Sequence, residues 1–176
     1  MRRSDRIQKL AQQITVNSRN HGFWDSGREP PETVCLIHSE ISEALEEYRD
    51  RPTDLLVVRY REGDEKPEGF GVELADIGIR ILDWVGHDGI KILPAYVGKG
   101  ELIGHIPRDL AVVHSELSKA LDGYLSNDNT AMVFRLSRVF WMIVRMARMH
   151  KIPLWSLISE KHKFNVGRPY KHGKAC

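Results

Sequence analysis

Apolar residues recur every three to four positions along several long stretches of the chain, a spacing that predicts amphipathic helices. The expected helices cover about residues 4–20, 31–50, 68–86, 112–124, 129–150 and 154–164, and we expect residues 165–174 to form an extended basic tail. Residues 51–69 are polar apart from 55–58 and contain Pro52, Gly63 and Pro67, so we expect a loop there with a short strand-like piece. The pattern therefore predicts an all-α fold, a helical bundle in a single domain over residues 1–176.

Two aromatic residues, Phe23 and Trp24, lie in the loop between the first two predicted helices. They either close the end of the hydrophobic core or offer a surface on which a planar ligand stacks. Closing the core is the commoner role, and the ligand interpretation stays open.

Two acidic pairs lie within the predicted helices, Glu40 with Glu43 and Glu73 with Asp76. Three residues turn an α-helix through about 300°, so the two acids of each pair share a helical face. Because apolar residues flank both pairs, we expect the two helices to pack together and gather four carboxylates at the edge of the core. Such a cluster would repel itself strongly unless a cation neutralised it.

The segment around the first acidic pair occurs twice in the chain. Residues 112–124 repeat residues 36–48 at a constant offset of 76, with seven of thirteen positions identical. The predicted helix 129–150 matches the earlier helix in pattern at an offset of 62. An internal duplication is the simplest explanation, with one repeat at about 1–90, a second at about 105–160 and a basic segment at 161–176.

The two repeats differ at the acidic positions. The corresponding pairs are Glu40 and Glu116, Glu43 and Lys119, Glu73 and Arg135, and Asp76 and Arg138. Three of the four candidate ligands are therefore lost in the second repeat. We expect that repeat to bind no metal, which leaves one site per chain.

The composition is typical of a globular protein, with 41% hydrophobic and 28% charged residues among 176. Cys35 and Cys176 form no disulfide framework and are expected to be free thiols. The chain starts without an apolar stretch of signal-peptide length, and no window approaches the length of a membrane span, so we expect a cytoplasmic protein with no membrane partner. A formal net charge of +2 gives no reason to expect nucleic acid, although the basic end suits a polyanionic ligand.

Clustered carboxylates are hard ligands that suit Mg²⁺ or Mn²⁺, and such ions support chemistry at phosphorus. Other interpretations fit less well. Neither acidic pair has the Glu-x-x-His spacing of a di-iron bundle, and His87-Asp88 alone is weak evidence for a His-Asp phosphohydrolase. A single Glu-x-x-Glu is usually a solvated helical face, but two pairs on adjacent apolar helices favour a metal.

The two acidic pairs together resemble the motif of the MazG-like all-α nucleoside triphosphate pyrophosphohydrolases, a superfamily that includes the dimeric dUTPases. The segment Lys161-x-x-x-Asn165-x-x-Arg168-Pro-Tyr-Lys-His-Gly-Lys174 is similar to the tail of many small members. The resemblance implies hydrolysis between the α- and β-phosphates of a nucleotide, which yields a monophosphate and pyrophosphate.

The same resemblance implies roles for individual residues. It makes Glu40, Glu43, Glu73 and Asp76 the catalytic residues and the ligands of Mg²⁺, with Mn²⁺ as the alternative. It assigns substrate binding to Lys161, Asn165, Arg168, Tyr170 and Lys174.

The resemblance also implies a homo-oligomer such as a dimer, whereas the duplication suggests a pseudo-dimer within one chain. Whether the basic segment serves the site of its own chain or that of a partner chain stays open. Two other functions also stay open: a catalytically weak nucleotide-binding or regulatory protein, and a nucleic-acid-binding helical protein.

Overall fold

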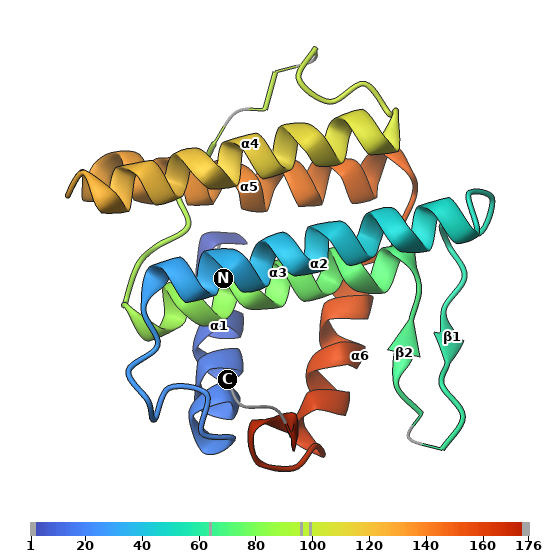
Figure 1. Cartoon of the computed structure of the whole chain (residues 1–176), viewed down its shortest axis with the longest axis horizontal. Helices are drawn as coiled ribbons and strands as arrows, with labels where there is room; N and C mark the ends of the chain where they lie inside the picture. Colours follow the sequence, from blue (N-terminus) through green and yellow to red (C-terminus); the bar gives the residue numbers. More distant parts are fainter. Residues whose placement is uncertain (1–2, 64, 96, 99, 174–176) are drawn as a thin grey trace.

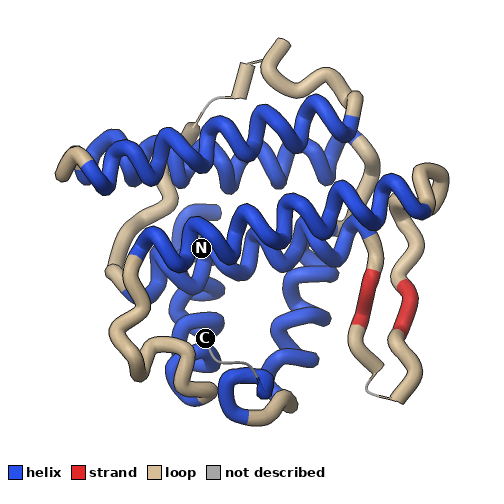
Figure 2. The backbone as a smooth tube through the Cα atoms, viewed as in Figure 1, coloured by secondary structure: helices blue, strands red, loops and turns tan. Residues whose placement is uncertain are grey.

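The protein is an all-α bundle, as the hydrophobic pattern predicted. The structure, a computed structural model, describes residues 3–63, 65–95, 97–98 and 100–173. Its helices are α1 (Arg3–Asn20), α2 (Pro30–Asp50), α3 (Phe70–His87), α4 (Ile106–Leu125), α5 (Asn129–Met149) and α6 (Leu154–Val166), followed by a 3₁₀ turn η1 (Tyr170–Gly173). One antiparallel pair of short strands, β1 (Arg59–Tyr60) and β2 (Pro67–Glu68), lies between α2 and α3 (Figures 1 and 2).

Two antiparallel helical hairpins form the centre of the molecule. Helices α2 and α3 make the first hairpin and α4 and α5 the second, with α2 packed against α4 and α3 against α5 (Figure 1). Helices α1 and α6 pack on α3 from the side away from the second hairpin. Helix α3 is therefore enclosed by α1, α2, α5 and α6, which explains why Leu74, Ile77 and Ile81 have no exposed surface.

Glycines on α3 allow α1 and α6 to approach it closely. A Cβ atom at Gly86 would lie 2.3 Å from Thr15 Oγ1 and 2.7 Å from the carbonyl oxygen of Ala11, both on α1. A Cβ at Gly78 would lie 3.3 Å from the side chain of Ile158 on α6. The absence of side chains at these positions allows α1 to approach the end of α3 at Gly86 and α6 to approach its middle at Gly78.

Residues that correspond in the two sequence repeats meet where the hairpins pack. His38 on α2 and His114 on α4 stack with ring centroids 5.0 Å apart, and their Nδ1 atoms are 2.7 Å apart. When two similar hairpins pack face to face, corresponding residues such as His38 and His114 are expected to meet. The duplication itself stays an inference from the sequence.

The structure differs from the sequence-based expectations in three segments. Residues 51–69 contain two short paired strands, at 59–60 and 67–68, rather than the single strand-like piece that we expected in this loop. Helix α4 begins at Ile106, well before the repeated segment, because Pro107 favours a first turn and the His105 ring accepts a hydrogen bond from the backbone N–H of Arg108.

The third difference is the C-terminal segment, which we expected to be extended. Instead α6 continues to Val166, and the chain then turns at η1. The backbone N–H of Lys171 donates to the carbonyl of His21 at 2.8 Å, which ties this turn to the loop after α1. Within the described ranges, no helix combines the length and the apolar character that a membrane-crossing segment needs.

Candidate functional site

Three of the four predicted acids converge where α2 and α3 pack. Glu40 on α2 and Glu73 and Asp76 on α3 each place one carboxylate oxygen within 4.8 Å of the others. Glu73 and Asp76 lie one helical turn apart, and the apolar faces of the two helices bring Glu40 opposite them. Glu40 and Glu73 are 8% and 4% exposed, so their charges are removed from most of the solvent.

Glu43 lies outside this cluster but lines the same cleft. Its side chain is exposed, and its Oε1 accepts a hydrogen bond from the Ser39 hydroxyl at 3.1 Å, one turn earlier on α2. The structure thus places Glu43 at the rim of the site and the other three acids inside it.

Burial and mutual repulsion change the acidity of the inner carboxylates. Burial, followed by the charge of Asp76, raises the pKa of Glu73 to about 8, although the nearby Lys161 ammonium opposes the shift. Glu73 Oε2 is buried and has no hydrogen-bond partner among the described residues. Burial also raises the pKa of Glu40, against the opposing charge of Arg80. An additional cation would therefore be favoured at this cluster.

Two cationic side chains already touch the cluster. Lys161 Nζ on α6 lies 2.6 Å from Asp76 Oδ2, and Arg80 Nε and Nη2 each lie 3.0 Å from Glu40 Oε1. Lys161 is only 3% exposed, which is rare for a lysine and requires a paired charge. These contacts neutralise part of the negative charge, but no ion pair to Glu73 or Glu43 is present in the described part of the chain.

A cleft of about 100 Å³ opens beside the carboxylates. Its wall includes Glu40 and Glu43 of α2, Asp76 and Asp83 of α3, and Asn17, Ser18 and Phe23. Side chains of the C-terminal segment complete it: Lys161, His162, Asn165 and Arg168. The C-terminal segment therefore reaches the acidic cluster of its own chain, because α6 packs along α3 (Figure 1).

The predicted substrate-binding residues divide into two groups. Lys161, Asn165 and Arg168 line the cleft, and Asn165 Oδ1 is buried with no hydrogen-bond partner among the described residues. Tyr170 does not line it, since its hydroxyl donates to Asp25 Oδ2 at 2.8 Å on the protein surface. Lys174 lies outside the described residues.

The two aromatic residues after α1 have different surroundings. Phe23 is buried and lines the cleft. Trp24 stacks on His87 with ring centroids 3.6 Å apart, and its indole N–H donates to Asp83 Oδ1 at 3.1 Å. Trp24 thus closes the end of the bundle, whereas Phe23 contributes both to the core and to the cleft wall.

Sequence reasoning missed Arg80 and Asp83, which both line the cleft. The comparison of the repeats contained a signal for Asp83. At the offset of 62 it corresponds to Arg145, the same reversal from acid to base that marks Glu73 and Asp76. Arg80 corresponds to Met142, so its charge is also lost in the second repeat.

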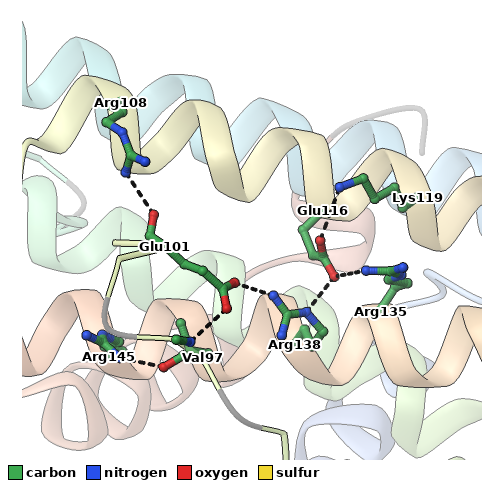
Figure 3. Close-up of polar contacts among 9 residues, drawn as sticks. Val97, Glu101, Arg108, Glu116, Lys119, Arg135, Arg138 and Arg145 are labelled. Atoms are coloured by element: carbon green, nitrogen blue, oxygen red, sulfur yellow. Dashed lines mark hydrogen bonds and ion pairs between the residues drawn. The ribbon is translucent and has the colours of Figure 1, made fainter. Parts of the chain in front are cut away.

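The second hairpin holds a different polar network at the corresponding positions (Figure 3). Glu116, which is 4% exposed, accepts hydrogen bonds from Arg135 Nη1 at 2.9 Å and Arg138 Nε at 2.7 Å, and Lys119 Nζ lies 3.6 Å away. Arg138 also pairs with Glu101 from the loop before α4. Burial alone would raise the pKa of Glu116, but the two arginines outweigh burial and hold that pKa below its usual range.

Comparisons of the chain with protein-family models, with curated proteins and with solved structures found no match.

Proposed function

We propose that this chain is a divalent-cation-dependent nucleotide pyrophosphohydrolase of the MazG-like type, acting in the cytoplasm. The observation that carries the proposal is the convergence of Glu40, Glu73 and Asp76 within 4.8 Å beside a cleft lined by basic residues. Carboxylates and phosphates are both ligands of Mg²⁺ and Mn²⁺, so one cation can join this acidic cluster to a nucleotide.

The donor set fits such a cation. All candidate ligands are carboxylate oxygens. Glu73 Oε2, which has no hydrogen-bond partner within the described ranges, is a buried acceptor that a cation would satisfy. Glu43 would join from the rim. When bound, Mg²⁺ or Mn²⁺ supplies charge neutralisation at phosphorus and a lowered pKa of coordinated water.

The basic residues of the cleft would bind the phosphates. Lys161, Arg168 and Lys66 reach it from α6, from the turn after α6 and from the loop between the short strands. Guanidinium and ammonium groups hold phosphate oxygens in place, and the Asn165 amide can orient the nucleotide. A cleft of about 100 Å³ is smaller than the ~300 Å³ or more of common ligand sites, so part of the substrate would remain at the surface.

The test is release of pyrophosphate from a panel of nucleoside triphosphates with Mg²⁺, for the wild type and two variants. Asp76→Asn and Glu43→Gln should each lower kcat/KM by about 100-fold or more, since loss of a metal ligand removes several kcal/mol of transition-state stabilisation. Glu46→Gln, a nearby change on α2 that does not line the cleft, is the matched control and should leave turnover unchanged. Wild-type rates in both ligand variants would disprove the metal assignment.

A catalytically weak nucleotide-binding protein is the second candidate. The pairs of Lys161 with Asp76 and of Arg80 with Glu40 favour it, because they neutralise two of the acids without a metal. Nucleotide binding that is independent of Mg²⁺, without turnover of any nucleotide, would support this candidate over the hydrolase.

The resemblance also leads us to propose a homo-oligomer. Light scattering after size-exclusion chromatography would give the mass of the particle, and a single-chain mass would show that the two hairpins of one chain suffice.

A further inference from the structure

Asp83 is the acid of the cleft to which the proposed reaction gives no role. It lies seven residues after Asp76 on the same helix, which is about 10 Å along the axis. This spacing places Asp83 away from the metal-ligand cluster, yet both residues line one cleft. A nucleotide whose phosphates lie near Asp76 would extend its base toward the Asp83 end.

The surroundings of Asp83 make it an acceptor. Trp24 Nε1 donates to Oδ1 at 3.1 Å, and the Ser18 hydroxyl also hydrogen-bonds to the carboxylate. Burial raises the pKa of Asp83, and the two donors and the charges of Arg28 and Arg80 oppose that shift only in part. Both hydrogen bonds use the carboxylate as an acceptor, and its remaining lone pairs can accept a hydrogen bond from a ligand.

The neighbouring cleft wall suits a base. Phe23 and Ile79 provide apolar surface, and Asn17 and Ser18 provide polar groups at the edge of that surface. A planar heterocycle needs both, because its faces are apolar and its edge carries donors and acceptors.

The reversal of charge in the second repeat connects Asp83 with the metal ligands. Arg145 stands at the corresponding position and donates to the carbonyl of Val97, so the second hairpin has no acid there. Asp83 is therefore replaced by a basic residue in the second repeat, as are Glu43, Glu73 and Asp76, the acids that the proposed function requires.

We propose that Asp83 reads the base of the substrate by accepting a hydrogen bond from an exocyclic amino group. The substrate class is then the nucleotides of cytosine, adenine and guanine, which carry such a group, rather than those of uracil and thymine. At the ring position where cytosine carries its amino group, uracil and thymine carry a carbonyl oxygen, which a buried carboxylate repels. This inference rests on the proposed function for the position of the phosphates.

The experiment is calorimetric titration with CMP, AMP, GMP, UMP and TMP in the absence of divalent metal. For the wild type, at least one amino-bearing monophosphate should bind about tenfold more tightly than UMP and TMP, since a hydrogen bond to a charged group contributes that much or more. Asp83→Asn, which keeps the shape and an acceptor for Trp24, should reduce this ratio toward one. The thermal unfolding midpoint verifies that the variant is folded.

Asp88→Asn is the matched control. Asp88 also accepts a hydrogen bond from a tryptophan indole, that of Trp84 at 2.8 Å, but it does not line the cleft. The control should keep the wild-type ratio. If the wild type binds UMP or TMP as tightly as the amino-bearing monophosphates, binds none of them, or keeps its preference in Asp83→Asn, the inference is overturned.

The preference for amino-bearing bases over uracil and thymine can also be measured as a ratio of kcat/KM values for the triphosphates. Together the binding and kinetic ratios distinguish the proposed hydrolase activity from the proposed role of Asp83. Preferential monophosphate binding without any turnover would contradict the hydrolase and support the role of Asp83. Turnover with no change of base preference in Asp83→Asn would support the hydrolase and contradict the role of Asp83.

Discussion

Glu40 and Glu116 correspond in the two repeats, yet their surroundings differ. Both are buried glutamates on the first helix of a hairpin. Burial raises the pKa of Glu40, whereas two arginines hold the pKa of Glu116 below its usual range despite burial. Glu116 alone is paired with three cationic side chains, Lys119, Arg135 and Arg138. The three carboxylates of the cluster around Glu40 share two, Arg80 and Lys161.

Glu73 gives the first prediction at this scale, a loss of stability with rising pH. Its pKa is about 8 in the folded protein and near 4.5 in the unfolded chain, so between these values only the folded state holds the proton. The free energy of unfolding should therefore fall as pH rises through this window, by up to about 1.4 kcal/mol per pH unit. Urea unfolding at several pH values with a chelator measures the slope.

The Glu73→Gln variant is the control for that slope, because glutamine does not titrate. The difference between the wild type and the variant isolates Glu73 from the other groups that titrate in this range. Mg²⁺ should stabilise the wild type more at pH 8.5 than at pH 6, since the carboxylate must lose its proton to bind a cation. An equal slope in both proteins would contradict the assigned protonation of Glu73.

Residue spacing predicted a large part of the candidate site. The three-residue spacing placed Glu73 and Asp76 on one face, and the flanking apolar residues predicted the packing that brings Glu40 to them. Spacing could not predict that Glu43 stays at the rim or that Tyr170 turns toward Asp25. The position of Tyr170 depends on the path of the turn after α6, which tertiary contacts determine, and Glu43 instead interacts with Ser39 of its own helix.

At the scale of elements, the existence of the helices was predictable because most of them bury one apolar stripe, whereas their first and last residues were less predictable. Helix α3 differs from the others because it is buried on almost every side. Its glycines carried no periodic signal, although they determine how closely α1 and α6 approach. Close helix packing of this type is visible only when the partner helix is known.

Gly86 gives a prediction about the contact between α1 and α3. Gly86→Ala should lower the free energy of unfolding by about 1–3 kcal/mol, because the new Cβ would meet the backbone oxygen of Ala11 at 2.7 Å and a backbone cannot rotate away. Gly78→Ala, in the same helix, gains the same helix propensity but meets only the flexible end of Ile158 at 3.3 Å. In urea unfolding Gly78→Ala should be neutral or stabilising; an equal loss in both variants would rule out the contact as the cause.

At the scale of the whole molecule, the two hairpins share an architecture but differ in their charged interiors. The first hairpin has a cleft, a buried carboxylate oxygen (Glu73 Oε2) with no hydrogen-bond partner in the described part of the chain, and helices α1 and α6 packed on it. In the second hairpin, Glu116 is matched by Arg135, Arg138 and Lys119 (Figure 3). We expect the first hairpin to carry the chemistry and the second to stabilise the fold without a metal.

The matched variants Glu40→Gln and Glu116→Gln test this division. Glu116→Gln leaves Arg135 and Arg138 without their shared carboxylate, which should lower the free energy of unfolding by about 3 kcal/mol, the lower end for a buried pair because Arg135 is partly exposed. It should leave the stabilisation by Mg²⁺ intact.

Glu40→Gln should have the opposite effect. Without metal it should cost less than Glu116→Gln, because burial already disfavours the charge of Glu40 and this carboxylate pairs with one arginine, Arg80, rather than two. It should abolish the stabilisation by Mg²⁺, about 2.7 kcal/mol at 100 times the dissociation constant for the wild type. Thermal unfolding of both variants, with and without Mg²⁺, is the measurement. If Glu116→Gln removed the Mg²⁺ effect, or Glu40→Gln retained it, the metal would bind elsewhere and the two hairpins would not differ in the proposed way.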